Sequence, residues 1–190
     1  MLRWQRCWRH FFLILTVKTD CSLCPVYSLG GTSQSHSIVT GRPTVSDPEK
    51  QVLRAIDTYK SAVLAKNAET FMRLYDPEVR VFDTWGIWSY EGAAAWRIAV
   101  EGWLSSLGNE SVRVTFEDVK IIGEPSFASM SAFATYGAFS AQGQELRAMQ
   151  NRISWVLKSR GHVLRVVHEH TSAPIGFEDA KAILKREGKS

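Results

Sequence analysis

The sequence predicts an α+β domain in which a cone-shaped, curved antiparallel sheet carries three N-terminal-side helices on its concave face. Two observations support this fold class. Apolar residues recur with the period of a helix in the first half of the domain, and from residue 111 onward they alternate with the period of a strand. The strand segments are also joined by very short turns, so consecutive strands must be antiparallel.

Three helices are expected before the strands. The first begins at Asp47-Pro48, within a Ser-x-x-Glu capping box that starts at Ser46. The second covers residues 68–75, with Asn67 as its N-cap and Asp76-Pro77 after its end. The third covers residues 92–107. Residues at helical spacing give the first and third helices one apolar face each, formed by Val52, Ile56, Tyr59 and Val63 and by Trp96, Val100, Trp103 and Leu107.

The strands follow from period-2 alternation. A first strand is expected at residues 79–83, and four longer ones at residues 111–122, 127–141, 144–158 and 163–171. A short amphipathic helix is expected at residues 177–185. We therefore divide the chain into an N-terminal extension (1–46), the cone domain (47–176) and a short C-terminal helix or tail (177–190).

The positive charge of the chain lies in the extension. Residues 1–46 hold five basic residues and one acidic residue, which accounts for the whole net charge of +4. The remaining residues are balanced, so nucleic-acid binding by the folded part is not expected. All three cysteines also lie in the extension. Cys21 and Cys24 form a single C-x-x-C pair without histidines at zinc spacing, and we expect two unstructured thiols.

The extension is expected to be disordered or to act as a targeting segment. Arginines precede an apolar run at residues 11–17, which is far shorter than the roughly 20 residues of a membrane span. No small-residue cleavage site follows it, whereas the Ser/Thr-rich stretch beyond is also found in organellar transit peptides. A wrongly placed start codon is a third interpretation. The protein is expected in the cytoplasm by default, and in an organelle or outside the cell if the extension is a targeting segment.

Two segments carry a family resemblance. "YDPEVRVFDTWGIWSYEG" at residues 75–92 and "NRISWVLKSRGHVLRVVHEHTSAP" at residues 151–174 resemble the signature regions of the SnoaL-like, nuclear-transport-factor-2-like superfamily. In pattern they are similar to SnoaL-like domains of unassigned function and to the association domain of calcium/calmodulin-dependent kinase II. The resemblance implies the cone-shaped fold predicted above, in most members as a dimer.

The steroid isomerase branch of this superfamily suggests roles for two residues. Tyr59 and Asp83 fall at the positions of that branch's helix tyrosine and strand aspartate. A carboxylate walled in by Trp85 and Trp88 would lose hydration and become a usable base, and a phenol opposite could stabilise an enolate. That branch's third residue, an aspartate, has no counterpart here, so steroid isomerisation is not expected. Turn formation by Asp83 and core packing by Tyr59 remain alternatives.

Arg152 resembles an arginine of the kinase association domain that points into the pocket. In a dry cone its guanidinium would hold a carboxylate or pair with Asp83. If Arg152 faces the pocket, the apolar residues that alternate with it form the outer face and need burial, which a homodimer through the sheet would supply. These residues are Met149, Ile153, Trp155 and Leu157.

His168 and His170 point to the same side if their strand is regular. A metal site is not expected because no third ligand accompanies them. If both side chains lie on the floor of a pocket, His170 could act as a catalytic acid or base. His168 could form a hydrogen bond to the ligand. A structural role, fastening the strand end to the first helix, is the other interpretation.

Together these features predict a cone domain that binds a small organic molecule without a cofactor. Tyr59, Asp83 and His170 are the candidate catalytic residues, and Arg152, His168, Trp85 and Trp88 are the candidate binding residues. The ligand is expected to be a small carboxylate or an enolisable carbonyl compound. If the domain is an enzyme, it performs isomerase- or lyase-like acid–base chemistry. The alternative is a non-catalytic ligand-binding or oligomerisation module.

Overall fold

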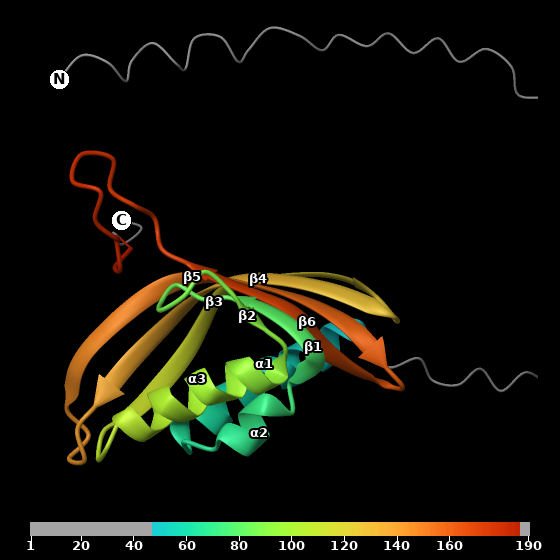
Figure 1. The fold of residues 1–190 in the computed structure, drawn as a ribbon, viewed down its shortest axis with the longest axis horizontal. Coiled ribbons are helices and arrows are strands. Elements are labelled where there is room, and N and C mark those ends of the chain that lie inside the picture. The colour runs from blue at the N-terminus through green and yellow to red at the C-terminus, as the bar shows by residue number, and fades with distance from the viewer. Residues whose placement is uncertain (1–46, 187–190) are drawn as a thin grey trace, which may run out of the picture. The chain divides into compact units, whose positions relative to one another are not determined.

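A curved sheet of six strands with three helices on its concave side forms the described part of the chain (Figure 1). The computed structural model describes residues 47–186. These residues belong to one compact unit, residues 42–190. The α+β fold class predicted from the sequence is confirmed. The extension, with its cysteines, its apolar run and its expected targeting role, lies outside the described residues.

The first two helices begin where the capping residues predict. Helix α1 (Pro48–Leu64) is capped by Asp47, whose side chain accepts a hydrogen bond from the backbone N–H of Glu49 at 3.0 Å. Helix α2 (Ala68–Met72) is capped by Asn67, which accepts from the N–H of Thr70 at 2.9 Å. Helix α2 is shorter than expected, because strand β1 already begins at Tyr75, before the proline.

Strand β1 (Tyr75–Phe82) tolerates Pro77 because its register with the neighbouring strand is irregular between Tyr75 and Arg80. A short strand β2 (Tyr90–Glu91), which the sequence did not predict, pairs with β1. Helix α3 (Ala93–Ser106) follows directly, with Gly92 as its N-cap, whose φ of 82° suits glycine. No helix among the described residues is long and apolar enough to cross a membrane.

Four long strands form the predicted antiparallel meander. They are β3 (Ser111–Glu124), β4 (Phe127–Phe139), β5 (Glu145–Arg160) and β6 (Val163–Ser172). The strand order is β2-β1-β6-β5-β4-β3, and β1 lies parallel to β6. The sheet is therefore antiparallel except at this one pair, which brings the end of β1 beside the end of β6.

The C-terminal helix predicted over residues 177–185 is wrong. The segment after β6 makes a turn closed by a single bridge between Ile175 and Ala182. It then runs along the part of β5 that β6 leaves unpaired, where the N–H of Gln150 donates to the backbone oxygen of Leu184 at 2.7 Å. An unpaired strand edge offers backbone groups for such hydrogen bonds. Pairing with β5 therefore determines the conformation of this segment, although its apolar residues have helical spacing.

Candidate functional site

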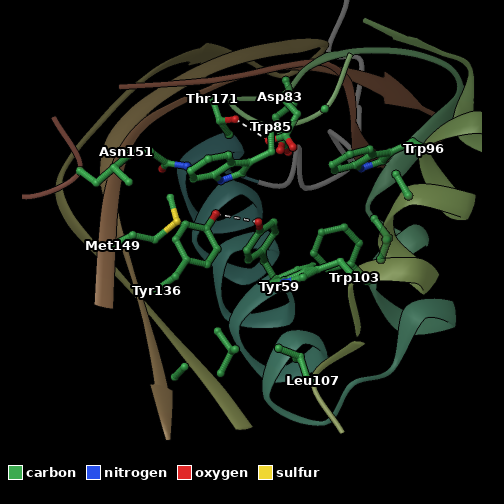
Figure 2. Close-up of a pocket in the computed structure, with 18 of the residues that line it drawn as sticks. Tyr59, Asp83, Trp85, Trp96, Trp103, Leu107, Tyr136, Met149, Asn151 and Thr171 are labelled. Atoms are coloured by element: carbon green, nitrogen blue, oxygen red, sulfur yellow. Dashed lines mark hydrogen bonds between the residues drawn. The ribbon is translucent and has the colours of Figure 1, made fainter. Parts of the chain in front are cut away.

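A cavity of about 590 Å³ lies between the concave face of the sheet and helices α1 and α3 (Figure 2). This volume falls in the range of sites that hold small organic molecules. Most of the wall is apolar, and its aromatic members are Tyr59, Phe71, Trp85, Tyr90, Trp96, Trp103 and Tyr136. Its polar and charged side chains, apart from the tyrosines, are Asp83, Arg147, Asn151, Glu169 and Thr171.

Two phenols meet in this wall. The hydroxyl oxygens of Tyr59, on α1, and Tyr136, on β4, lie 2.9 Å apart. Burial is the main cause that raises the pKa of both hydroxyls above the ordinary value of 10.0, so both stay protonated at neutral pH. One hydroxyl donates to the other, and the second keeps a hydrogen that it can offer elsewhere. Tyr59 is thus a buried tyrosine and also part of the cavity wall.

Asp83 lies immediately after β1 and also lines the cavity. Its Oδ1 accepts a hydrogen bond from the hydroxyl of Thr171 at 2.7 Å. The same Thr171 oxygen accepts from the backbone N–H of Thr84 at 2.8 Å, which fixes the position of the threonine. Figure 2 shows the hydroxyls of Tyr59 and Tyr136 directed toward the end of the cavity where Asp83 and Thr171 lie.

Glu169 is a buried carboxyl that the sequence analysis did not select. Its side chain on β6 is only 1% exposed and lines the cavity. Oε2 accepts two hydrogen bonds, from the hydroxyl of Tyr75 at 2.6 Å and from Nε1 of Trp155 at 2.8 Å. The pKa of Glu169 is raised to about 7, mainly by loss of hydration and to a smaller extent by the nearby Asp83, while the two hydrogen bonds act in the opposite direction.

Of the two tryptophans predicted beside Asp83, only one lies in the cavity wall. Trp85 lines the cavity, although half of its side chain is exposed. Trp88 is 97% exposed and lies outside the cavity wall, so its predicted place in the pocket is wrong. The loop between β1 and β2 turns the two rings in different directions.

Arg152 does not face the cavity. On β5, Asn151, Ile153 and Trp155 are buried on the concave side, whereas Arg152 is exposed on the other face. The apolar set that would have formed an outer face is therefore inside. The reason given for a homodimer through the sheet does not hold, and the homodimer itself stays a prediction.

His168 and His170 also lie outside the cavity wall, because a β-bulge in β6 shifts the alternation of inward and outward side chains by one residue. Consecutive residues of β5 pair with Val166 and His168, which leaves Val167 as an extra residue on β6. Before the bulge Val166 is buried, and after it Glu169 and Thr171 are buried. The expected positions of both histidines on the pocket floor are thus wrong. Nδ1 of His168 lies 2.9 Å from the backbone oxygen of Arg80, so this ring fastens β6 to β1 rather than to the first helix.

The sequence analysis missed six polar residues of the wall: Tyr90, Tyr136, Arg147, Asn151, Glu169 and Thr171. Tyr136 and Asn151 stand at inward strand positions whose inward neighbours are apolar, whereas Glu169 and Thr171 face inward because of the bulge in β6. For Asn151 the signal was available, because Ile153, Trp155 and Leu157 continue its alternation. Among residues 47–186 no group of three His, Cys, Asp or Glu side chains is arranged to hold a metal ion.

Comparison with known proteins gives a family and a fold. Residues 52–176 match the family model described as "SnoaL-like domain". No curated protein matches the chain. In total 417 chains of solved structures match, so the fold is shared too widely to identify one activity.

Three of these structures illustrate the similarity. An NTF2-like protein of unknown function from Pseudomonas putida KT2440 is 17% identical, with a TM-score of 0.66, over 74% of this chain and 96% of that one. A Xanthomonas campestris structure named for the calcium/calmodulin-dependent protein kinase II association domain is 16% identical, with a TM-score of 0.54, over 74% and 97%. A Catenulispora acidiphila structure in complex with S-DNPA is 13% identical, with a TM-score of 0.56, over 66% and 92%.

Proposed function

The chain belongs to the SnoaL-like domain family, and from the lining of its cavity we propose that it binds a small neutral carbonyl compound and moves a proton on it without a cofactor. One observation carries this proposal. Asp83 and the hydroxyl pair of Tyr59 and Tyr136 face the same largely apolar volume (Figure 2). A base and a hydrogen-bond donor held around one volume are what proton abstraction next to a carbonyl requires.

Asp83 is the proposed base. Thr171 holds one carboxylate oxygen, which fixes the direction of the side chain without adding a positive charge. The other oxygen would take a proton from the carbon next to the ligand carbonyl. The hydroxyl hydrogen left over in the Tyr59–Tyr136 pair would then stabilise the enolate oxygen.

Charge favours a carbonyl compound over the carboxylate that the sequence analysis also allowed. The described cavity wall holds two carboxyl groups, those of Asp83 and Glu169. Its one cationic side chain, Arg147, makes two hydrogen bonds to Glu110, at 3.1 and 2.6 Å. An anionic ligand would meet these carboxyl groups without a free cation, whereas a neutral carbonyl compound would not be repelled.

Glu169 is the proposed second proton carrier. With a pKa of about 7 it is partly protonated at neutral pH, and its Oε2 is occupied by Tyr75 and Trp155. A proton on Oε1 could be delivered to the ligand while Asp83 acts as the base. Two carboxyl groups with different environments form a suitable acid–base pair.

Asp83→Asn is expected to abolish proton exchange. β-Tetralone has acidic hydrogens beside its carbonyl, and their exchange in D₂O can be followed by NMR. We expect the wild-type protein to accelerate this exchange, and Asp83→Asn to lower the acceleration by about 10²–10⁴-fold, because the amide cannot accept the proton. Asp57→Asn, at an exposed aspartate of α1, is the matched control and should leave the rate unchanged. An unchanged rate in Asp83→Asn would exclude Asp83 as the base.

The same experiment tests the alternative of a non-catalytic module. Stabilisation of the wild-type protein by β-tetralone without any exchange would indicate ligand binding or oligomerisation rather than catalysis. The similarity to the kinase association domain structure supports this alternative only at the level of the fold.

A further inference from the structure

The cavity meets solvent between the β1–β2 loop and the first part of β5. Three of its described lining residues are exposed, namely Trp85 and Gly86 in the loop and Arg147 on β5, while the others are buried or half-buried. In the sheet, β6 lies between β1 and β5, but its pairing with β5 ends where Ser172 faces Arg152. The part of β5 before this pair has no β6 neighbour, so the cavity wall has a gap there.

The segment after β6 places one apolar side chain at this gap. Leu184 is half-buried and lines the cavity. Its backbone oxygen accepts a hydrogen bond from the N–H of Gln150 at 2.7 Å, so Leu184 takes the place beside β5 that β6 has left. A leucine side chain in this position completes the apolar wall, and it also narrows the path of an entering molecule.

The side-chain contacts that hold this end of the segment are exposed. The N–H of Arg186 donates to Oε1 of Gln150 at 2.7 Å. The Arg186 guanidinium lies 3.8 Å from the ring centroid of Phe133 and donates to Oε2 of Glu117 at 3.3 Å. Between residues 175 and 182 the segment folds back on itself (Figure 1). Exposed ion pairs contribute little free energy, so this end can detach without unfolding of the sheet.

We propose that residues 173–186 form a strap across the entrance of the cavity, and that Leu184 limits the width of the molecules that enter. A narrow molecule passes beside Leu184 while the strap stays in place. A wider molecule enters only when the Arg186 end of the strap detaches. This inference goes beyond the proposed function, because it concerns entry and does not depend on proton transfer by Asp83.

Labelling of a cysteine inside the cavity tests the strap without any ligand. The full chain carries Val100→Cys as the reporter, because Val100 is buried on α3 and lines the cavity. The three native cysteines are replaced by serine. Two neutral reagents with the same leaving group are compared, methyl methanethiosulfonate and the wider benzyl methanethiosulfonate. Mass spectrometry of the intact protein gives the labelling rate for each reagent.

Leu184→Ala should raise the benzyl labelling rate about tenfold and the methyl rate by less than about twofold, because the leucine side chain obstructs only the wider reagent. Arg186→Ala keeps Leu184 but removes the contacts of the strap with Phe133 and Glu117. It should raise the benzyl rate about three- to tenfold, because the strap detaches more often. Phe177→Ala, at a fully exposed residue of the same strap, is the control and should keep both rates.

A benzyl rate that stays at the wild-type value in Leu184→Ala or in Arg186→Ala would overturn the proposal. An equal rise in Phe177→Ala would do the same, because Phe177 is not part of the cavity wall. A rise that follows a lowered urea unfolding midpoint would also overturn it, since the labelling would then report global unfolding. Faster benzyl labelling in a protein that does not accelerate β-tetralone exchange would leave the strap standing while the proposed function fails.

Discussion

Trp155→Ala is expected to lower the free energy of unfolding by about 3–5 kcal/mol, the usual cost of removing a fully buried tryptophan. The indole ring is 0% exposed and packs against Tyr59 and Phe116, at centroid distances of 5.7 and 5.9 Å. It also supplies one of the two hydrogen bonds that Glu169 accepts. The substitution therefore opens a void beside the cavity and removes a donor from a buried carboxyl.

Urea unfolding at neutral pH measures this loss. Trp88→Ala is the matched control, because the Trp88 side chain is 97% exposed. It should change the free energy of unfolding by no more than about 0.5 kcal/mol. Equal unfolding midpoints for the two variants would show that Trp155 does not hold the sheet and α1 together.

Glu169→Gln is expected to stabilise the folded chain by about 3 kcal/mol at pH 8 and to have little effect near pH 5. In the folded state the pKa of Glu169 is about 7, whereas its ordinary value is 4.5. Between these values the folded chain holds a proton that the unfolded chain releases, so wild-type stability falls as the pH rises from about 4.5 to 7. Gln stays neutral throughout, and its oxygen can still accept the bonds from Tyr75 and Trp155.

Urea titrations at pH 5, 6, 7 and 8 would trace this difference. Glu124→Gln, at an exposed position at the end of β3, is the control and should follow the wild-type curve. Parallel wild-type and Glu169→Gln curves over this range would show that Glu169 ionises at its ordinary pKa in the folded chain. Near-UV circular dichroism of Glu169→Gln checks that the amide occupies the place of the carboxyl.

Most of the fold could be predicted because long elements repeat their pattern many times. The meander and the capped starts of α1 and α2 follow from alternation and capping residues. The errors lie in short elements. Strand β2 has two residues, too few to show a period. Helix α2 ends early because Tyr75 already belongs to strand β1. The segment after β6 has helical spacing, yet backbone bonding to β5 determines its conformation.

The site could be predicted only in part, because side-chain direction depends on strand register. Tyr59 and Asp83 lie in the cavity wall, one on a helix face and one at a strand end, where no register error intervenes. For Arg152, the apolar alternation of β5 already indicated the outward direction, and the family resemblance indicated the opposite. Burial of Ile153 and Trp155 shows that the hydrophobic pattern is the stronger guide, since turning the strand would expose both.

The bulge at Val167 determines which functional groups of β6 line the cavity. β6 carries a carboxyl and a hydroxyl on one face, at Glu169 and Thr171, and two imidazoles on the other, at His168 and His170. Deleting Val167 would restore an unbroken two-residue repeat and keep Glu169 and Thr171 on the cavity side, because the deletion removes only the unpaired residue. A strand of the present length paired without the bulge would instead turn the two imidazoles toward the cavity, an exchange of functional groups that no point substitution of a wall residue produces.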